Sequence, residues 1–252
     1  CRHLGIPLVH NPYIHPGEWG DTPRLLDSYI HADQLILASE HLRGFITRKA
    51  GTGAGILINP PLFPDPPPRL QPAHEIPVNT PFILFLGRRE EAKGLDTLLK
   101  AYRLIDTRAW LVIAGPGPRI EHPPRQCVDL GEVDENVKHW LLQKCLLFCL
   151  PSRSESFGIV YAEAMRCGKA VIACDRPPVN EIIVNGETGM LLDPCTPRHL
   201  AAVLSHLIGD TDLLMRLGKN ARKRYRDTYD CAVSARTIDT CYRNLLRQYQ
   251  RA

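Results

Sequence analysis

The fold is decided by one segment, LLFCLPSRSESFGIVYAE (residues 146–163). Its first five residues form an unbroken apolar run, which is typical of a strand buried on both faces of a parallel sheet. Residues 157–167 have apolar side chains at helical spacing. The segment therefore predicts a strand, a loop and a helix. In an open parallel sheet ligands bind in such loops, and the free N–H groups of the first helical turn can bind phosphate oxygens.

Two carboxylates flank this turn. Glu155 lies in the loop, and Glu163 follows eight residues later on the helix. One or two helical turns separate them, which is too far for the two groups to share a proton. We therefore expect them to have different roles.

The rest of the chain alternates short apolar runs with stretches of helical period, which predicts an α/β fold with doubly wound parallel sheets. The predicted strands are residues 7–10, 34–39, 55–58, 82–86, 110–114, 128–130, 171–174 and 190–192. The predicted helices are residues 22–31, 40–50, 95–104, 135–144, 197–208, 210–227 and 231–249.

A proline-rich stretch, residues 59–77, is the best domain boundary because it forbids regular structure. Only about three strands precede it, too few for a well-covered doubly wound sheet. We therefore expect the first domain to be incomplete and the chain to be a fragment. The predicted organisation is a domain remnant, a linker, a second domain and a closing helix, at residues 1–68, 69–78, 79–230 and 231–252.

Composition narrows the class of protein. The 252 residues are 44% hydrophobic and 23% charged, which is ordinary for a globular protein. No apolar stretch approaches the roughly 20 residues of a membrane span, and the first residues lack the apolar core of a signal peptide, so a cytoplasmic protein is expected. The net charge of +4 is mild, and no nucleic-acid-binding motif accompanies it. The nine cysteines form no Cys-x-x-Cys pair; we interpret them as reduced, with one structural disulfide as the less favoured alternative.

Four blocks of sequence then appear in a fixed order. They are FLGR (85–88) followed by Lys93-Gly94, GPGP (115–118), LPS (150–152) with Glu155 and Glu163, and NGETG (185–189). Together they resemble a retaining GT-B glycosyltransferase of family 4, also called glycosyl transferases group 1. The resemblance covers most of residues 80–220. It implies two Rossmann-like domains in a GT-B arrangement, the first of them incomplete here.

The resemblance also implies roles for single residues. Arg88 and Lys93 would stabilise charge developing on a leaving diphosphate, which agrees with their place after a strand and beside Gly87 and Gly94. Glu155 would contact the transferred sugar, and Glu163 the nucleotide ribose. The donor would also be held by the following residues: Gly87, Gly115, Val133, Ser156, Phe157, Gly158 and Ile159.

Several residues also have interpretations without a binding or catalytic role. Arg89 is expected to be solvated and neutralised by Glu90 and Glu91, and Glu163 could be an ordinary solvent-facing helix residue. His15 resembles a family histidine that faces the donor sugar, but His10 is a rival and a surface role has nearly equal weight. The basic residues between Arg216 and Arg226 are interpreted as a solvated helix face, with contact to acidic lipid headgroups as the alternative.

Two departures from the family pattern are visible. Residues 176–181 read RPPVNE where many members have Gly-Gly-x-Pro-Glu, which puts contacts of that loop in doubt. The family's N-terminal glycine-rich loop would precede residue 1. The resemblance further implies a final helix that packs on the first domain, with Leu245, Leu246 and Tyr249 on one face.

The function implied is transfer of a sugar from a nucleotide diphosphate sugar, of UDP or GDP type, to an acceptor hydroxyl with retention at the anomeric carbon. No metal and no other cofactor is expected. The acceptor would be a saccharide, a lipid-linked molecule or a small molecule, with peripheral contact at the inner membrane surface as an option and no nucleic-acid partner. The alternatives are a noncatalytic nucleotide-sugar-binding fragment or subunit and, less favoured, an epimerase or phosphorylase on the same fold.

Overall fold

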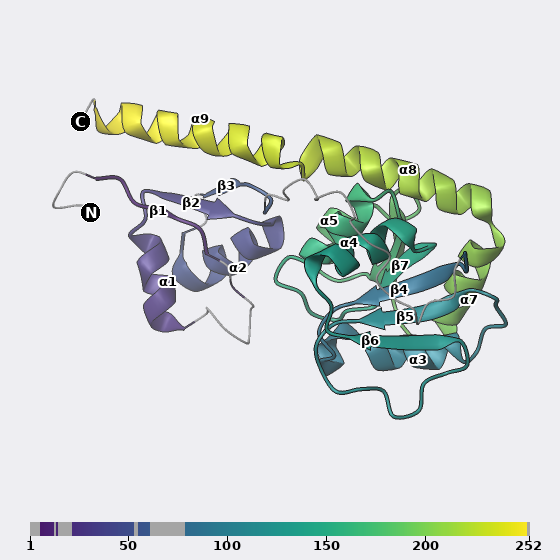
Figure 1. Cartoon of the computed structure of the whole chain (residues 1–252). Coiled ribbons are helices and arrows are strands. Elements are labelled where there is room, and N and C mark those ends of the chain that lie inside the picture. The colour runs from purple at the N-terminus through teal and green to yellow at the C-terminus, as the bar shows by residue number, and fades with distance from the viewer. Residues whose placement is uncertain (1–5, 13, 15–21, 53–54, 61–78, 251–252) are drawn as a thin grey trace. The chain divides into compact units, whose positions relative to one another are not determined.

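The computed structural model describes residues 6–12, 14, 22–52, 55–60 and 79–250, and the chain divides into two units (Figure 1). Unit 1 comprises Cys1–Phe63, Glu155–Phe157 and Asp227–Ala252. Unit 2 comprises Pro64–Ser154 and Gly158–Arg226. The domain boundaries drawn from the sequence stay predictions, and the proline-rich linker at 69–78 lies outside the described residues.

Unit 1 contains a small parallel sheet in the order β1-β2-β3, made of Val9–His10, Gln34–Leu37 and Gly55–Leu57. Two helices, α1 (Pro23–Ile30) and α2 (Glu40–Ala50), belong to the same unit. α2 begins where the Ser39 hydroxyl accepts a hydrogen bond from the N–H of Leu42 (3.1 Å), and it ends at Gly51. The three strands fit the expectation that the first Rossmann-like domain is only partly represented in these 252 residues.

The last helix, α9 (Cys231–Tyr249), has the predicted bounds and belongs to unit 1. Near its start the Ser234 hydroxyl donates a hydrogen bond to the carbonyl of Asn59 (2.9 Å). Leu245 is buried, but the side chain of Leu246 is 52% exposed. Of these two leucines, which were predicted to share one face, only Leu245 is packed, because adjacent helical residues point about 100° apart.

Unit 2 is built on a six-stranded parallel sheet in the order β6-β5-β4-β7-β8-β9. Its strands are β4 (Phe82–Leu86), β5 (Trp110–Ala114), β6 (Cys127–Gly131), β7 (Leu147–Leu150), β8 (Ala170–Cys174) and β9 (Gly189–Leu192). The residues of β4, β7 and β8 are all buried, as expected of strands covered on both faces. The strand order reverses direction between β4 and β7, so the loops after these two strands flank the topological switch point.

The helices of unit 2 cover both faces of this sheet (Figure 1). They are α3 (Leu95–Tyr102), α4 (Glu135–Lys144), α5 (Ile159–Arg166), α6 (Val179–Ile182), α7 (Pro197–Gly209) and α8 (Thr211–Thr228), whose last two residues fall in unit 1. α3 packs beside α7, and α4 contacts α5. α6 was not predicted, and it lies in the loop that departs from the family pattern.

Two observations concern the described residues as a whole. The eight cysteines among them are all free thiols, so no disulfide connects this part of the chain. Within the same residues, no helix is both long enough and apolar enough to cross a lipid bilayer.

Candidate functional site

The loops that follow β4 and β7 are joined to each other at the switch point. The backbone N–H of Arg153 donates to the carbonyl of Ala92 (2.7 Å), and the Ser152 hydroxyl donates to the same oxygen (3.3 Å). Ser152 is buried and also donates to the carbonyl of Ser154 (2.9 Å). The loop that carries Arg88 and Lys93 is thus hydrogen-bonded to the loop between β7 and α5, which is predicted to bind phosphate.

A glycine makes this junction possible. Gly94 has a φ of +72° and follows the short 3-10 helix Glu91–Lys93. A Cβ atom at Gly94 would lie 2.1 Å from the carbonyl oxygen of Pro151. Any larger residue would therefore have to push the two loops apart, and it would also occupy a left-handed conformation that disfavours L side chains.

The two predicted cations differ in their surroundings. Lys93 is buried, with 9% of its surface exposed. The Arg88 side chain is 57% exposed, and its Nη1 lies 2.5 Å from Oε1 of Glu90. Burial therefore restricts the movement of the Lys93 side chain, whereas Arg88 has room to change partner.

Arg89 is the clearest correction to the sequence prediction. Its side chain is only 3% exposed, and it forms a two-pronged ion pair with Asp129 of β6, in which Nη1 lies 2.8 Å from Oδ2. Nη1 also donates to the carbonyl of Pro118 (2.6 Å). The expected neutralisation by Glu90 and Glu91 is wrong, because Glu90 pairs with Arg88 and the half-buried Asp129 is the partner of Arg89.

The Asp129 carboxylate also binds backbone N–H groups. It accepts hydrogen bonds from the N–H groups of Ile120 and Gly131, each at 3.0 Å. Burial raises the pKa of the Asp129 carboxyl, but the hydrogen bonds and the charge of Arg89 outweigh burial and hold the pKa below its usual value. Arg89 and Asp129 therefore tie the loops after β4, β5 and β6 together.

The glycine turns after β4 and β5 are in close contact. Gly115 has a φ of +130°, and a Cβ atom there would lie 2.1 Å from the carbonyl oxygen of Gly87. The N–H of Gly87 donates to the carbonyl of Ala114 (3.0 Å), and the N–H of Gly115 donates to that of Gly131 (2.7 Å). The predicted donor-binding positions Gly87 and Gly115 are thus brought together, while Val133 lies half-buried in the turn after β6.

Helix α5 begins later than expected, at Ile159 instead of residue 157, because Gly158 ends the loop with a φ of +94°. A glycine supplies no side-chain oxygen to the N–H groups of the first helical turn. The helix is fixed to the sheet by Tyr161, whose hydroxyl donates to the carbonyl of Leu150 at the end of β7 (2.9 Å). The N-terminus of α5 is therefore held at the carboxyl end of β7, as the sequence predicts.

Glu163 is buried, with 9% of its surface exposed, so the solvent-facing interpretation is wrong. Its Oε1 accepts a hydrogen bond from Nζ of Lys138 on α4 (2.9 Å), and Lys138 also contacts Glu135 (2.6 Å). Burial lowers the pKa of Lys138, but the two carboxylates outweigh burial and raise it. The charged state of Lys138 is therefore stabilised, and Lys138 fixes one oxygen of Glu163.

The remaining predicted residues lie elsewhere or outside the description. Glu155, Ser156 and Phe157 belong to unit 1, where the Phe157 ring is buried and contacts Tyr229 at 6.2 Å between centroids. His15 lies outside the described residues. The rival histidine, His10, lies edge-on to Tyr29 within unit 1, with ring centroids 4.7 Å apart.

Four residues were missed by sequence reasoning: Arg89, Asp129, Lys138 and Tyr161. One signal could have revealed the first pair, since Asp129 is a lone charge in an otherwise apolar strand and such a charge needs a partner. In the loop that departs from the family pattern, Arg224 of α8 donates to the carbonyls of Ile182 (2.8 Å) and Glu181 (2.7 Å).

A parallel sheet of this strand order, with a glycine-rich loop and a helix N-terminus at its switch point, defines a Rossmann-like α/β unit. The sequence profile of the glycosyl transferases group 1 family matches residues 68–224, so the chain belongs to that family.

Two relatives found by sequence similarity are also glycosyltransferases by name. The chain is 31% identical over 150 residues to an uncharacterized glycosyltransferase of Methanocaldococcus jannaschii, covering 56% of this chain and 42% of that protein. It is 27% identical over 266 residues to the D-inositol 3-phosphate glycosyltransferase of Xylanimonas cellulosilytica, covering 88% of this chain and 62% of the relative. The chain thus spans roughly half the length of these two relatives.

Solved structures share the fold. The sucrose-phosphate synthase of Thermosynechococcus elongatus aligns with a TM-score of 0.78 at 23% identity, covering 95% of this chain and 68% of that one. Anabaena HepE, solved in complex with UDP and glucose, aligns with a TM-score of 0.77 at 19% identity, covering 94% and 71%. These likenesses confirm the predicted GT-B class with its two Rossmann-like units.

Proposed function

We propose that this chain supplies the donor side of a retaining glycosyltransferase, which moves a sugar from a nucleotide diphosphate sugar to an acceptor hydroxyl without a metal ion. The observation that carries the proposal is the junction at the switch point. There, hydrogen bonds to Ala92 and the close contact of Gly94 with Pro151 join the Arg88–Lys93 loop to the loop that leads into α5.

The chemistry of sugar transfer explains why such a junction is useful. Cleavage of the bond between the sugar and the diphosphate places negative charge on the leaving phosphate. Fixed cations stabilise that charge more in the transition state than in the ground state, and they need little reorganisation if the fold already positions them. The burial of Lys93 supports a fixed point charge, and the exposure of Arg88 supports a guanidinium that exchanges Glu90 for phosphate oxygens.

The donor is proposed to lie across the carboxyl ends of β4 and β7. Its diphosphate would face the N–H groups at the start of α5, and Gly158 allows close approach there. Its ribose would bind Glu163, which Lys138 holds through one oxygen and leaves with a second oxygen for a hydroxyl. The complex of HepE with UDP makes UDP-sugars the first donors to test.

Retention would follow if the acceptor hydroxyl attacks from the face that the leaving phosphate vacates, with that phosphate accepting the proton. This route requires no carboxylate nucleophile on the opposite face of the sugar. Glu155 and His15 are proposed to act on the sugar from their own loops.

Calorimetric titration with UDP and GDP tests the phosphate assignment. Lys93→Ala should weaken binding of the preferred nucleoside diphosphate by roughly 1.5–3 kcal/mol, the scale of a charge-assisted contact. Lys100→Ala is the matched control, because Lys100 is an exposed lysine on α3 paired only with Asp96 across one helical turn (2.7 Å). Equal affinity of wild type and Lys93→Ala would exclude Lys93 from the diphosphate site.

Transfer itself is tested by incubating the chain with UDP-sugars and a panel of saccharide, lipid-linked and small-molecule acceptors, and by assigning the anomeric configuration of the product by NMR, with and without a chelator. Retention with the chelator present supports the proposal, and inversion or loss of activity on chelation contradicts it. Nucleotide binding without any sugar release would favour the alternative, a noncatalytic nucleotide-sugar-binding subunit.

A further inference from the structure

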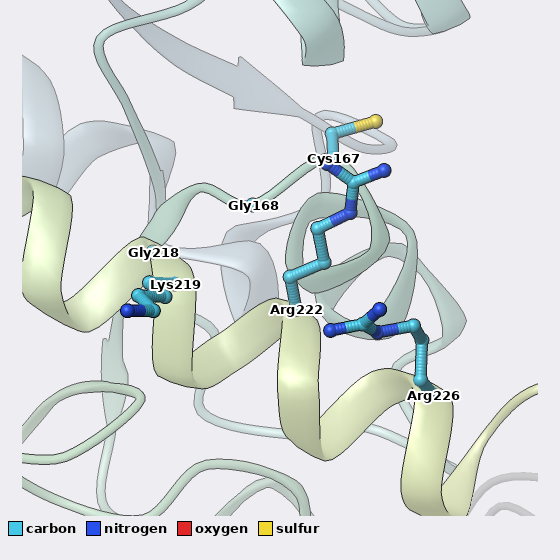
Figure 2. Close-up of a pocket in the computed structure, with 6 residues that line it drawn as sticks. All are labelled: Cys167, Gly168, Gly218, Lys219, Arg222 and Arg226. Carbon is cyan, nitrogen blue, oxygen red and sulfur yellow. The ribbon is translucent and has the colours of Figure 1, made fainter.

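A second charged site lies at the other end of the strands. Figure 2 shows a hollow of about 520 Å³ between α8 and the turn that follows α5. Its lining residues are Cys167, Gly168, Gly218, Lys219, Arg222 and Arg226. The volume lies within the roughly 300–1,000 Å³ typical of small-molecule sites. Because Gly168 comes just before β8, the hollow lies toward the amino ends of the strands, away from the switch-point loops.

The backbone of α8 meets this turn directly. A Cβ atom at Gly218 would lie 2.1 Å from the carbonyl oxygen of Gly168, so the helix and the turn are in close contact there. Lys219, Arg222 and Arg226 are spaced three and four residues apart and therefore share one side of α8. In Figure 2 all three rise from successive turns of the helix, with Arg226 pointing back toward Arg222.

These three cations have no partner within the part of the chain that the structure describes. No hydrogen bond or ion pair joins the side chain of Lys219, Arg222 or Arg226 to another described residue. Arg224 on the same helix is different, because it is bound to the carbonyls of Ile182 and Glu181. The cations of α8 thus divide into one that holds the fold together and three that line a hollow.

A structural explanation has to be weighed against a ligand. The hollow adjoins the C-terminus of α5, whose carbonyls carry roughly half a negative charge and favour nearby cations. Three full positive charges exceed that partial charge several-fold. A Cβ atom at Gly168 would lie 3.7 Å from the aliphatic Cδ of Arg222, so the stem of this side chain lies near the turn, and no hydrogen bond from its guanidinium to the turn is present among the described residues. Most of the positive charge therefore remains available.

A neighbouring hollow of about 300 Å³ extends the same surface. It shares Gly168 and adds two more cations, Lys144 and Lys169, while no carboxylate lines either hollow in the described residues. Five cations thus gather in one region of a chain whose formal net charge is +4.

We infer that the hollow lined by Lys219, Arg222 and Arg226 is a binding site for a phosphate group, separate from the nucleotide site. Two guanidinium groups one helical turn apart can bind the oxygens of one phosphate, and Lys219 adds a third positive charge. The phosphate belongs to a soluble phosphorylated compound or to a lipid headgroup. This site goes beyond sugar transfer, since none of its residues belongs to the proposed donor site.

Binding to the full chain is measured by calorimetry with inorganic pyrophosphate, in the presence of saturating UDP. Arg222→Gln/Arg226→Gln should weaken pyrophosphate binding by about tenfold or more, because it removes two charge-assisted contacts. Arg198→Gln/Arg216→Gln is the matched control, since it removes the same charge from exposed positions on α7 and α8 outside the hollow. The control should change binding less than about twofold, the effect of distant screened charges.

A second arm identifies the source of the phosphate. The same three proteins are sedimented with phosphatidylcholine vesicles containing about one third phosphatidylglycerol, and with phosphatidylcholine alone. The site is supported if Arg222→Gln/Arg226→Gln loses binding to pyrophosphate or to the phosphatidylglycerol vesicles while the control double variant keeps it. If only vesicle binding is lost, the phosphate belongs to a lipid headgroup. Absence of binding to both probes, or equal weakening in both double variants, overturns it.

Two further variants test for a folding defect and for independence from the donor site. Lys219→Gln changes a single exposed side chain and should weaken pyrophosphate binding severalfold, so a folding defect in the double variant does not decide the test. Lys93→Ala should lower UDP affinity and leave the pyrophosphate signal at the hollow unchanged. Failure of the donor assignment is thereby separable from failure of this site.

Discussion

The two ends of the six-stranded sheet use charged side chains in opposite ways. At the carboxyl ends, Arg89 and Lys138 are buried or half-buried and bind carboxylates on other elements. At the amino ends, Arg222 and Arg226 are exposed and have no partner among the residues described. The comparison teaches that Arg89 and Lys138 hold other elements of the candidate nucleotide site in place, whereas the cations of the hollow hold no described element.

The largest effect is expected from breaking the buried pair. Arg89→Met removes the close guanidinium partner of Asp129 and leaves this carboxylate only the exposed Arg119, at 3.7 Å, as a cationic partner, so the free energy of unfolding should fall by about 3–4 kcal/mol. Chemical denaturation at neutral pH measures this loss. Arg222→Met is the matched control at the other end of the sheet, where an exposed cation should contribute less than about 0.5 kcal/mol.

The same pair has a defined pH dependence. The pKa of Asp129 is lowered in the folded protein, so the pair contributes fully above the ordinary carboxyl pKa of about 4 and is lost as pH falls through the lower, folded-state value. The stability difference between wild type and Arg89→Met should therefore be constant near neutrality and shrink below about pH 4. A difference that is unchanged down to acidic pH would contradict the pairing.

A smaller loss is expected from separating the two loops at the switch point. Gly94→Ala places a Cβ 2.1 Å from the Pro151 carbonyl oxygen and forces an L side chain to adopt a φ of +72°. We expect a destabilisation of about 2–3 kcal/mol, together with weaker nucleotide binding. Thermal unfolding and calorimetry report the two effects separately.

Gly186 supplies a close control for this change. Its φ is +76°, but a Cβ atom there would meet no atom within 4 Å. Gly186→Ala therefore carries the backbone strain without the clash, and should cost about 1 kcal/mol with nucleotide affinity unchanged. If both alanine variants bind nucleotide equally well, the contact between Gly94 and Pro151 does not organise the site.

Local pattern was enough to predict most of unit 2. The apolar runs at 82–86 and 110–114 became strands with the predicted bounds, and the helix at 135–144 was also exact. These elements follow from short-range periodicity, which a sequence displays directly. The loops of the site were placed correctly for the same reason, because a loop after a parallel strand must lie at the carboxyl end.

Pairing between distant charges was not predictable in the same way. Arg89 finds its carboxylate 40 positions away and Lys138 finds Glu163 25 positions away, whereas Glu90 and Glu91 are next to Arg89 in the sequence. The partner is chosen by which strands are neighbours in the sheet, and β6 lies two strands from β4. The basic hollow was missed likewise, because the run of charge on α8 does not reveal that Gly218 brings three cations against a turn.

The smallest of the three effects concerns Lys138. Lys138→Met removes the ammonium that holds one oxygen of Glu163, so we expect UDP or GDP to bind about 1–2 kcal/mol more weakly, the scale of one charge-assisted hydrogen bond. Lys144→Met is the control on the same helix, since Lys144 is exposed and has no partner in the described residues. Lys138→Arg should restore part of the affinity if the charge matters. The comparison between paired and unpaired cations would fail at this point if Lys138→Met and Lys144→Met bound nucleotide alike, because Glu163 would then need no positioning by α4.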